Sequence, residues 1–230
     1  MINKKKLVII ILTAVVILAT GIITKQPFFL MIPLFVSLFV MTFQSEANRI
    51  GALIGAINAV IYTFTYLYMG VYASAASGLL FSFPVQLITF FNWKKKAYKK
   101  TVVFKRMTNK VRILFFSGIG VLWAVLAVVF YYMQYEYAVF DSLLFLLGFI
   151  VPVLTALAFV EYTYLWIVQA IVGLFLNVQM VMNDTSQATY LVYGFFALYC
   201  VILAYINVQK FYKEQRVELN KKGEQNEKLY

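Results

Sequence analysis

Positively charged residues are distributed very unevenly along this chain of 230 residues. All but one of its 20 Lys and Arg residues fall in alternate gaps between eight apolar stretches; the exception is Lys25. The clusters lie at Lys4–Lys6, at Arg49, from Lys94 to Arg112 and from Lys210 to Lys228. Because cytoplasmic loops carry an excess of Lys and Arg, an even number of membrane spans with both termini in the cytoplasm places every cluster on one side. A seven-span chain would leave one cluster outside.

The apolar stretches have the length of membrane-spanning helices. The composition is 63% apolar and 13% charged, with a mean hydropathy of +0.83, which exceeds that of soluble domains. A bilayer core about 30 Å thick requires about 17 to 25 residues per helix. We predict spans at 7–24, 28–43, 51–69, 72–93, 113–133, 139–160, 163–182 and 188–208. The fold class is therefore all-α integral membrane, with about eight transmembrane helices.

Several classes of function lack the residues that they need. The sequence has no Gly-Lys-Ser/Thr phosphate loop, no His and a single Cys, Cys200, so it offers no ATPase site, metal cluster or His-activated nucleophile. The five acidic residues between the first and last spans lie in gaps or near span ends, which does not favour ion coupling. We attribute the net charge of +11 to membrane orientation and anionic lipid headgroups, and expect no nucleic-acid partner and no cofactor.

Three predicted spans carry stripes of polar and aromatic residues at helical spacing. The stripes are Asn58, Tyr62 and Tyr66 in the third span; Ser82, Gln86, Thr89 and Trp93 in the fourth; and Trp166, Gln169, Gly173 and Asn177 in the seventh. Such residues also join helices directly, at about 0.6 to 2 kcal/mol each. Three stripes together favour a shared polar pocket, because amides that face lipid would remain unsatisfied. Trp93 could instead anchor its span at the interface beside Lys94.

A weak internal repeat predicts how the spans are organised. Ser77-Gly78-Leu79-Leu80 in the fourth span is similar to Tyr193-Gly194-Phe195-Phe196 in the eighth, 116 residues later. This spacing predicts two parallel three-helix bundles with the fifth span as their connector. The expected units are 1–27, a cytoplasmic N-terminus with an extra helix; 28–93, the first bundle; 94–112, a basic cytoplasmic loop; 113–138, the linker helix; 139–208, the second bundle; and 209–230, a basic cytoplasmic tail.

Four consecutive motifs resemble the PnuC family of vitamin transporters. They are Arg49-Ile50-Gly51 through Asn58-Ala59-Val60-Ile61-Tyr62; Gly70-Val71-Tyr72-Ala73-Ser74; Phe83-Pro84-Val85-Gln86; and Phe91-Asn92-Trp93-Lys94-Lys95. Tyr164-Leu165-Trp166 resembles the family's later Leu-Trp helix. The resemblance covers residues 28 to 210 and is strongest from 49 to 96. Many members have a second Trp three residues after the first, and this chain does not.

The resemblance implies a fold similar to the SWEET sugar transporters, commonly assembled as a trimer in the cytoplasmic membrane. It also implies facilitated diffusion of nicotinamide riboside, followed by trapping through a separate cytoplasmic kinase. The implied substrate-binding residues are Asn58, Tyr62, Gln86, Trp93, Trp166, Gln169 and Asn177. Alternatives that stay open are a thiamine or nucleoside facilitator of the same fold, a substrate-binding subunit of an energised uptake complex, and a membrane-embedded enzyme or sensor.

Overall fold

The computed structural model describes residues 4–68, 72–98, 101–134 and 137–227. Within these ranges it describes the side chains of all residues except Tyr66, 72–74 and 220–227. Part of the motif that begins at Gly70 therefore lies outside the described residues. The elements are α1 (Lys4–Ile23), α2 (Phe28–Ser45), α3 (Ile50–Tyr68), α4 (Tyr72–Ser77), the π-helical η1 (Gly78–Ser82), α5 (Phe83–Lys95), β1 (Ala97–Tyr98), β2 (Thr101–Val102), α6 (Asn109–Tyr132), α7 (Ala138–Ala156), α8 (Tyr162–Asn183), the 3-10 turn η2 (Thr185–Gln187) and α9 (Ala188–Glu227).

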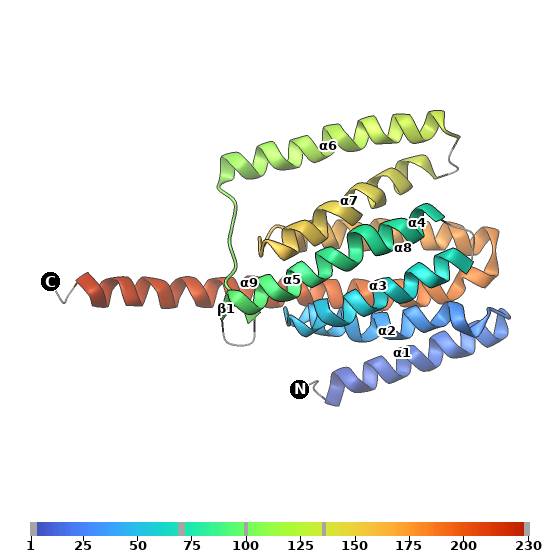
Figure 1. Ribbon diagram of the computed structural model, residues 1–230, viewed down its shortest axis with the longest axis horizontal. Coiled ribbons are helices and arrows are strands. Elements are labelled where there is room, and N and C mark those ends of the chain that lie inside the picture. The colour runs from blue at the N-terminus through green and yellow to red at the C-terminus, as the bar shows by residue number, and fades with distance from the viewer. Residues whose placement is uncertain (1–3, 69–71, 99–100, 135–136, 228–230) are drawn as a thin grey trace.

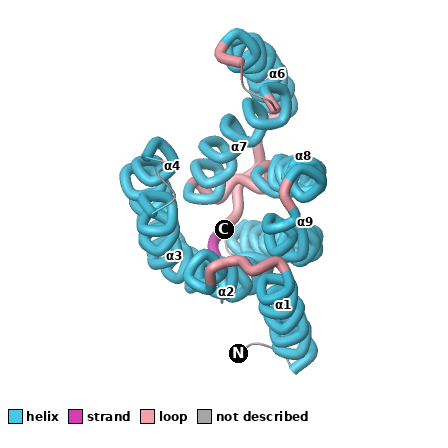
Figure 2. The backbone as a smooth tube through the Cα atoms, turned by 90° about the vertical axis from the view of Figure 1, so that its right-hand side faces the viewer, coloured by secondary structure: helices cyan, strands magenta, loops and turns pink. Residues whose placement is uncertain are grey.

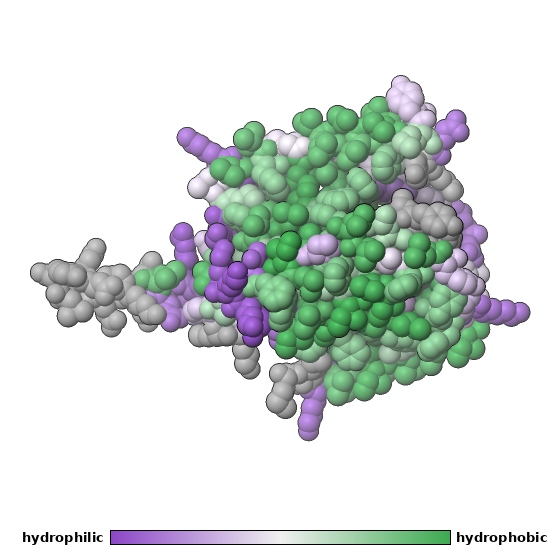
Figure 3. Space-filling model, viewed as in Figure 1, coloured by the Kyte–Doolittle hydropathy of each residue, from purple (hydrophilic) through white to green (hydrophobic). Residues whose placement is uncertain are grey.

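The helices have the lengths and apolar composition that the sequence predicts. Within the described residues, seven helical segments are long and apolar enough to cross a membrane, and the shorter apolar segment Ile50–Thr65 of α3 is a further candidate. Their large apolar side chains face outward, as Leu114 and Phe64 do, and form the green band of Figure 3 between polar ends. The all-α fold with about eight apolar helices is confirmed.

A ring of helices forms the body of the molecule. α2 packs against α3, α3 against α5, α5 against α7, α7 against α8, α8 against α9, and α9 returns to α2. Figure 2 shows this ring from one end, with α6 outside it against α7 and α1 outside it against α2 and α9. The functional interior therefore lies between helices from both halves of the chain.

The two halves of the ring run in the same direction. α6 follows the first half in the chain and returns the chain to the end where the first half began. α2 and α7 therefore both begin at the same end (Figure 1). A salt bridge from Lys6 Nζ to Glu46 Oε1, 2.7 Å long, joins the start of α1 to the end of α2. At the opposite end, Thr189 Oγ1 donates to Gln26 Oε1 at 2.5 Å. The basic clusters consequently gather at one end of the ring, which we call the basic end.

The predicted span 72–93 forms three consecutive segments: α4, η1 and α5. Pro84 has no N–H, and its ring clashes with the carbonyl of Leu80, four residues earlier, in a regular α-helix. The single π turn η1, directly before α5, is where the span departs from regular α-helical geometry. Gly78 also permits close packing here, because a Cβ would lie 2.8 Å from Thr63 Oγ1 of α3.

α9 is much longer than the predicted span 188–208. It continues through the basic tail to Glu227 and projects beyond the body of the molecule (Figure 1). Lys, Glu, Gln and Arg dominate residues 209–227 and are good helix formers, so the helix continues where the apolar sequence stops.

Candidate functional site

Two cavities lie among the helices, one lined by the ring alone and the other also by Phe130 of α6, which lies outside the ring. The outer cavity has a volume of about 800 Å³ and the inner cavity, nearer the basic end, about 190 Å³. The outer cavity is lined by Val40, Gly55, Asn58, Ala59, Tyr62, Ser77, Gly78, Ser82, Gln86, Phe130, Asp141, Leu144 and Phe145. The inner cavity is lined by Met41, Gln44, Asn48, Ala52, Gln86, Thr89, Trp93, Val151, Pro152, Thr155, Tyr162, Trp166 and Gln169.

Gln86 belongs to both linings and marks where the two cavities meet. Its side chain lies directly against α3, because Gly55 has no side chain there. A Cβ on Gly55 would stand 3.0 Å from Gln86 Cδ, closer than most carbon contacts. Gln44 Nε2 donates a long hydrogen bond, 3.5 Å, to Gln86 Oε1. A glycine on one helix thus positions an amide on another where the two cavities meet.

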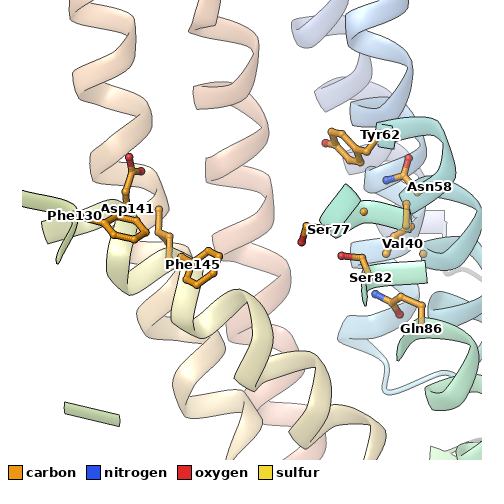
Figure 4. A pocket seen from close by; sticks show the side chains of 13 residues that line it. Val40, Asn58, Tyr62, Ser77, Ser82, Gln86, Phe130, Asp141 and Phe145 are labelled. Carbon is orange, nitrogen blue, oxygen red and sulfur yellow. The ribbon is translucent and has the colours of Figure 1, made fainter. Parts of the chain in front are cut away.

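A polar wall made by α3, α4, η1 and α5 lines one side of the outer cavity (Figure 4). Asn58 is its most buried amide, 5% exposed, and Nδ2 donates to Ser37 Oγ at 2.7 Å. Among the described residues, Asn58 Oδ1 has no hydrogen-bond partner. A buried acceptor without a partner is costly unless a ligand or water donates to it. The oxygen itself is buried in the wall, so a donor from the cavity can reach it only after the neighbouring side chains shift.

Asp141 lies on the opposite wall with Phe130 and Phe145 (Figure 4). The two rings pack against each other with their centroids 6.0 Å apart. Asp141 is not among the site residues that the sequence predicts, because a position near a span end does not by itself indicate a cavity. A signal was present: Asp141, Leu144 and Phe145 follow i, i+3, i+4, one face of α7, and all three line the cavity.

The inner cavity brings together aromatic and amide side chains from α5 and α8. Trp166 and Gln169 face Gln86 and Trp93 across it, so the predicted stripes of the fourth and seventh spans meet here. Trp166 also packs on the buried Tyr162, with ring centroids 6.0 Å apart. The cavity thus offers flat aromatic surface and amide hydrogen-bonding groups within one small volume.

The inner cavity ends at a closed junction near the basic end. Trp93 is 3% exposed, its Nε1 donates to the carbonyl of Thr155 at 2.8 Å, and its ring meets the edge of Phe104. Trp93 is therefore a buried residue of this junction, and the alternative of an interfacial anchor does not describe it. Val102, Phe104, Ala158 and Val160 form the buried cluster beneath it.

The loop between α5 and α6 supplies half of that junction. Lys105 N donates to Ala158 O at 2.8 Å, and Val160 N donates to Lys105 O at 2.9 Å, so the loop pairs with the turn between α7 and α8. The buried Glu161 accepts from Met107 N through Oε1 at 3.0 Å. These bonds hold the basic loop across the end of the pathway.

Asn177 is separate from the other predicted site residues. It lines neither cavity, and Nδ2 donates to the carbonyl of Tyr190 at 3.3 Å. Gly194 lies beside it, since a Cβ there would stand 3.1 Å from Asn177 Nδ2. Asn177 thus joins α8 to α9. The side chain of Tyr66, in the same stripe as Asn58, lies outside the described residues.

Comparisons with known proteins agree with this architecture. The sequence profile of a family described as "Nicotinamide mononucleotide transporter" matches residues 27–209. The crystal structure of the vitamin B3 transporter PnuC is similar, with a TM-score of 0.75 at 18% identity, over 93% of this chain and 94% of that one. No curated protein matches the sequence. Because the profile spans most of the chain and its apolar helices cross a membrane, this multi-pass membrane protein, a transporter and not an enzyme, belongs to the nicotinamide mononucleotide transporter family, the PnuC family.

Proposed function

We propose that this protein is a facilitator that carries nicotinamide riboside, or a closely related vitamin or nucleoside, through the ring of helices. The observation that supports this most is the pair of cavities that meet at Gln86. They form a discontinuous route along the ring, wide at one end and closed at the basic end. A substrate admitted to the outer cavity would pass Gln86 and reach Trp166.

The lining suits a nicotinamide linked to ribose. The pyridinium ring of nicotinamide riboside is cationic and flat, and the face of Trp166 would attract it by about 0.5 to 2 kcal/mol. Gln86 and Gln169 can bond its carboxamide, and the Asn58 amide can bond a ribose hydroxyl once the wall around it shifts. Tyr62 and Trp93 complete the set that we assign to substrate. Asn177 remains a proposed contact only for a state in which α8 and α9 have separated.

Charge favours the riboside over the mononucleotide. Neither cavity lining contains Lys or Arg among its described residues. A phosphate monoester carries about −1.5 to −2 charges at pH 7 and is normally bound by such residues or by helix N-termini. It would also approach Asp141. We therefore infer that the transported molecule lacks phosphate, although the family takes its printed name from the mononucleotide.

Several further features belong to the same proposal. The basic clusters at one end favour both termini in the cytoplasm of a cell whose cytoplasmic membrane holds the protein. Transport would be facilitated diffusion, with trapping by a separate cytoplasmic kinase. The resemblance to PnuC also favours a homotrimer, and the exposed outer face of α6 leaves room for lipid or a neighbouring subunit.

Purified protein in liposomes provides the test. We expect labelled nicotinamide riboside to equilibrate across the membrane without accumulating, and nicotinamide mononucleotide not to enter. Accumulation driven by a proton or Na⁺ gradient would contradict facilitated diffusion. Binding without any transport would instead favour a subunit of an energised complex. Competition of thiamine, riboflavin and uridine with labelled nicotinamide riboside ranks the alternative substrates by affinity. If one of them bound more tightly than the riboside, that compound would be the preferred substrate.

A further inference from the structure

We propose that Asp141 is the specificity residue through which the outer cavity selects positively charged substrates. This inference rests on the proposed function and adds a residue to which no role was assigned by sequence. It commits to one property of the substrate, a delocalised positive charge on a flat ring, as in N-glycosylated pyridinium compounds. Neutral nucleosides of the same size lack that charge.

The surroundings of Asp141 carry the proposal. Its carboxylate is the only acidic or basic side chain in either cavity lining that the structure describes. It forms no ion pair and no side-chain hydrogen bond with the described residues. The packed rings of Phe130 and Phe145 lie beside it, and the uncharged wall of Asn58, Ser77 and Ser82 lies across the cavity (Figure 4). An unpaired anion next to aromatic rings suits a flat organic cation.

Electrostatics make this one charge significant. At a given distance, two opposite charges attract several-fold more strongly near a protein surface than in bulk water, because the effective dielectric constant is lower there. Helix walls of low dielectric constant focus the field of Asp141 into the cavity. In contrast, an anionic substrate would be repelled over the same distance. One carboxylate can therefore provide both attraction and exclusion at the entrance of the pathway.

A structural role must be separated from this one. Asp141 lies in the first turn of α7, where a negative charge is favoured by the helix dipole. Asp141→Asn would then lower stability whether or not the residue meets substrate. A purely structural role predicts equal effects on all substrates, whereas a counter-ion predicts an effect that depends on the charge of the substrate.

Nicotinamide riboside and its reduced dihydropyridine form are suitable probes, because they share the ribose and carboxamide and differ in the ring charge. For Asp141→Asn, we expect the Kd of the cation to rise about five- to ten-fold and that of the neutral form to change less than about two-fold. Asp141→Glu should retain the preference. Asp184→Asn is the matched control, since it removes a carboxylate from the exposed turn between α8 and η2 at the same end of the ring.

Each outcome decides between the possibilities. If Asp141→Asn changed the Kd of both probes equally, or of neither, the role of Asp141 in specificity would be overturned. The proposed transport function would not be affected by that result. If the wild-type protein bound neither probe, the proposed function itself would be contradicted. The preference of the wild type for the cation should also shrink at high salt, because mobile ions screen a partly exposed charge. Size-exclusion profiles of all variants establish that they are folded.

Discussion

The indole nitrogen of Trp93 donates a hydrogen bond to the carbonyl oxygen of Thr155, 2.8 Å away, and so joins the end of α5 to the end of α7. These helices come from opposite halves of the chain. Both residues line the inner cavity, so this bond lies across the floor of that cavity. The facilitated diffusion that we propose requires the floor to open in each cycle, and we expect the bond to break when it does.

Trp93→Phe should loosen this junction. Phenylalanine preserves an aromatic ring but cannot donate, and the net loss of one hydrogen bond is about 0.5 to 1.5 kcal/mol. We expect a lower melting temperature and a larger population open toward the basic end. Thr89→Cys in a background without Cys200 reports on this opening, because Thr89 is buried in the inner cavity. Labelling from the basic side should increase in the Trp93→Phe protein, and unchanged labelling would exclude a role in closure.

Trp166→Ala and Gln86→Ala should weaken substrate binding while the protein still folds. Loss of an aromatic surface or of a buried hydrogen bond reduces binding by about 1 to 3 kcal/mol, roughly ten-fold or more in Kd. Asn177→Ala is the matched control on α8, because it removes an amide that joins two helices outside both cavities. It should reduce thermal stability and change the Kd much less than either cavity variant does. Titration calorimetry and thermal unfolding separate these outcomes, and normal binding by both cavity variants would make the stripes packing elements.

The sequence predicts the helices well because apolar length and charge distribution are local properties. Most residues of the predicted stripes also line the cavities, since helical spacing determines which side chains share a face. Asn177 differs for a geometric reason: it lies 11 residues beyond Trp166, about 16 Å along the helix axis. At that level α8 packs against α9, which periodicity alone does not reveal.

Other features depend on tertiary packing and could not be read from spacing. Closure of the ring needs α5 beside α7 and α9 beside α2, and neither pair is adjacent in sequence. The rotation of α7 decides whether Asp141 faces the cavity or the surrounding membrane. The π turn at Gly78–Ser82 arises from Pro84 together with close packing of Gly78 on α3. The residue types at this turn can be read from the sequence, but the π-helical backbone geometry depends on packing.

Gly55→Ala should disturb substrate binding through Gln86. The new methyl group would stand 3.0 Å from the Gln86 carboxamide and force it away from α3. A shift of a few tenths of an ångström relieves this contact, so we expect the Kd to rise by less than it does when the amide is lost in Gln86→Ala. Gly148→Ala is the control, since a Cβ there has no atom within 4 Å. Both changes improve helix propensity by up to about 1 kcal/mol, so a weaker affinity in Gly55→Ala alone isolates the effect on Gln86.

Membrane orientation can be tested by thiol labelling of intact cells. In a Cys200→Ser background, Lys96→Cys and Lys213→Cys should be protected from an impermeant reagent, because both exposed residues belong to the basic end. Thr185→Cys should react, since it lies in the exposed turn between α8 and α9. All three should react after the membrane is permeabilised. Labelling of Lys96→Cys in intact cells would contradict the predicted orientation and place the basic end outside the cell.

Gln215→Leu should release the basic loop from α9. The Gln215 carboxamide is buried, accepts from Phe104 N at 2.9 Å and donates to the carbonyl of Val102 at 2.8 Å. Leucine fills similar space but leaves two buried backbone groups unpaired, at about 1 to 3 kcal/mol each. We expect a lower melting temperature and faster hydrogen exchange at Phe104.

Gln209→Leu provides the comparison for that loop variant. It removes an amide from the same helix that bonds Tyr164 of α8 instead of the loop. Its exchange at Phe104 should match the wild type, and its effect on melting should be smaller because Gln209 is only partly buried. Since the loop lies across the closed end of the pathway, Gln215→Leu should also raise labelling of Thr89→Cys from the basic side. Faster exchange at Phe104 without increased labelling would show that the loop can detach while Trp93 and Thr155 keep the floor closed.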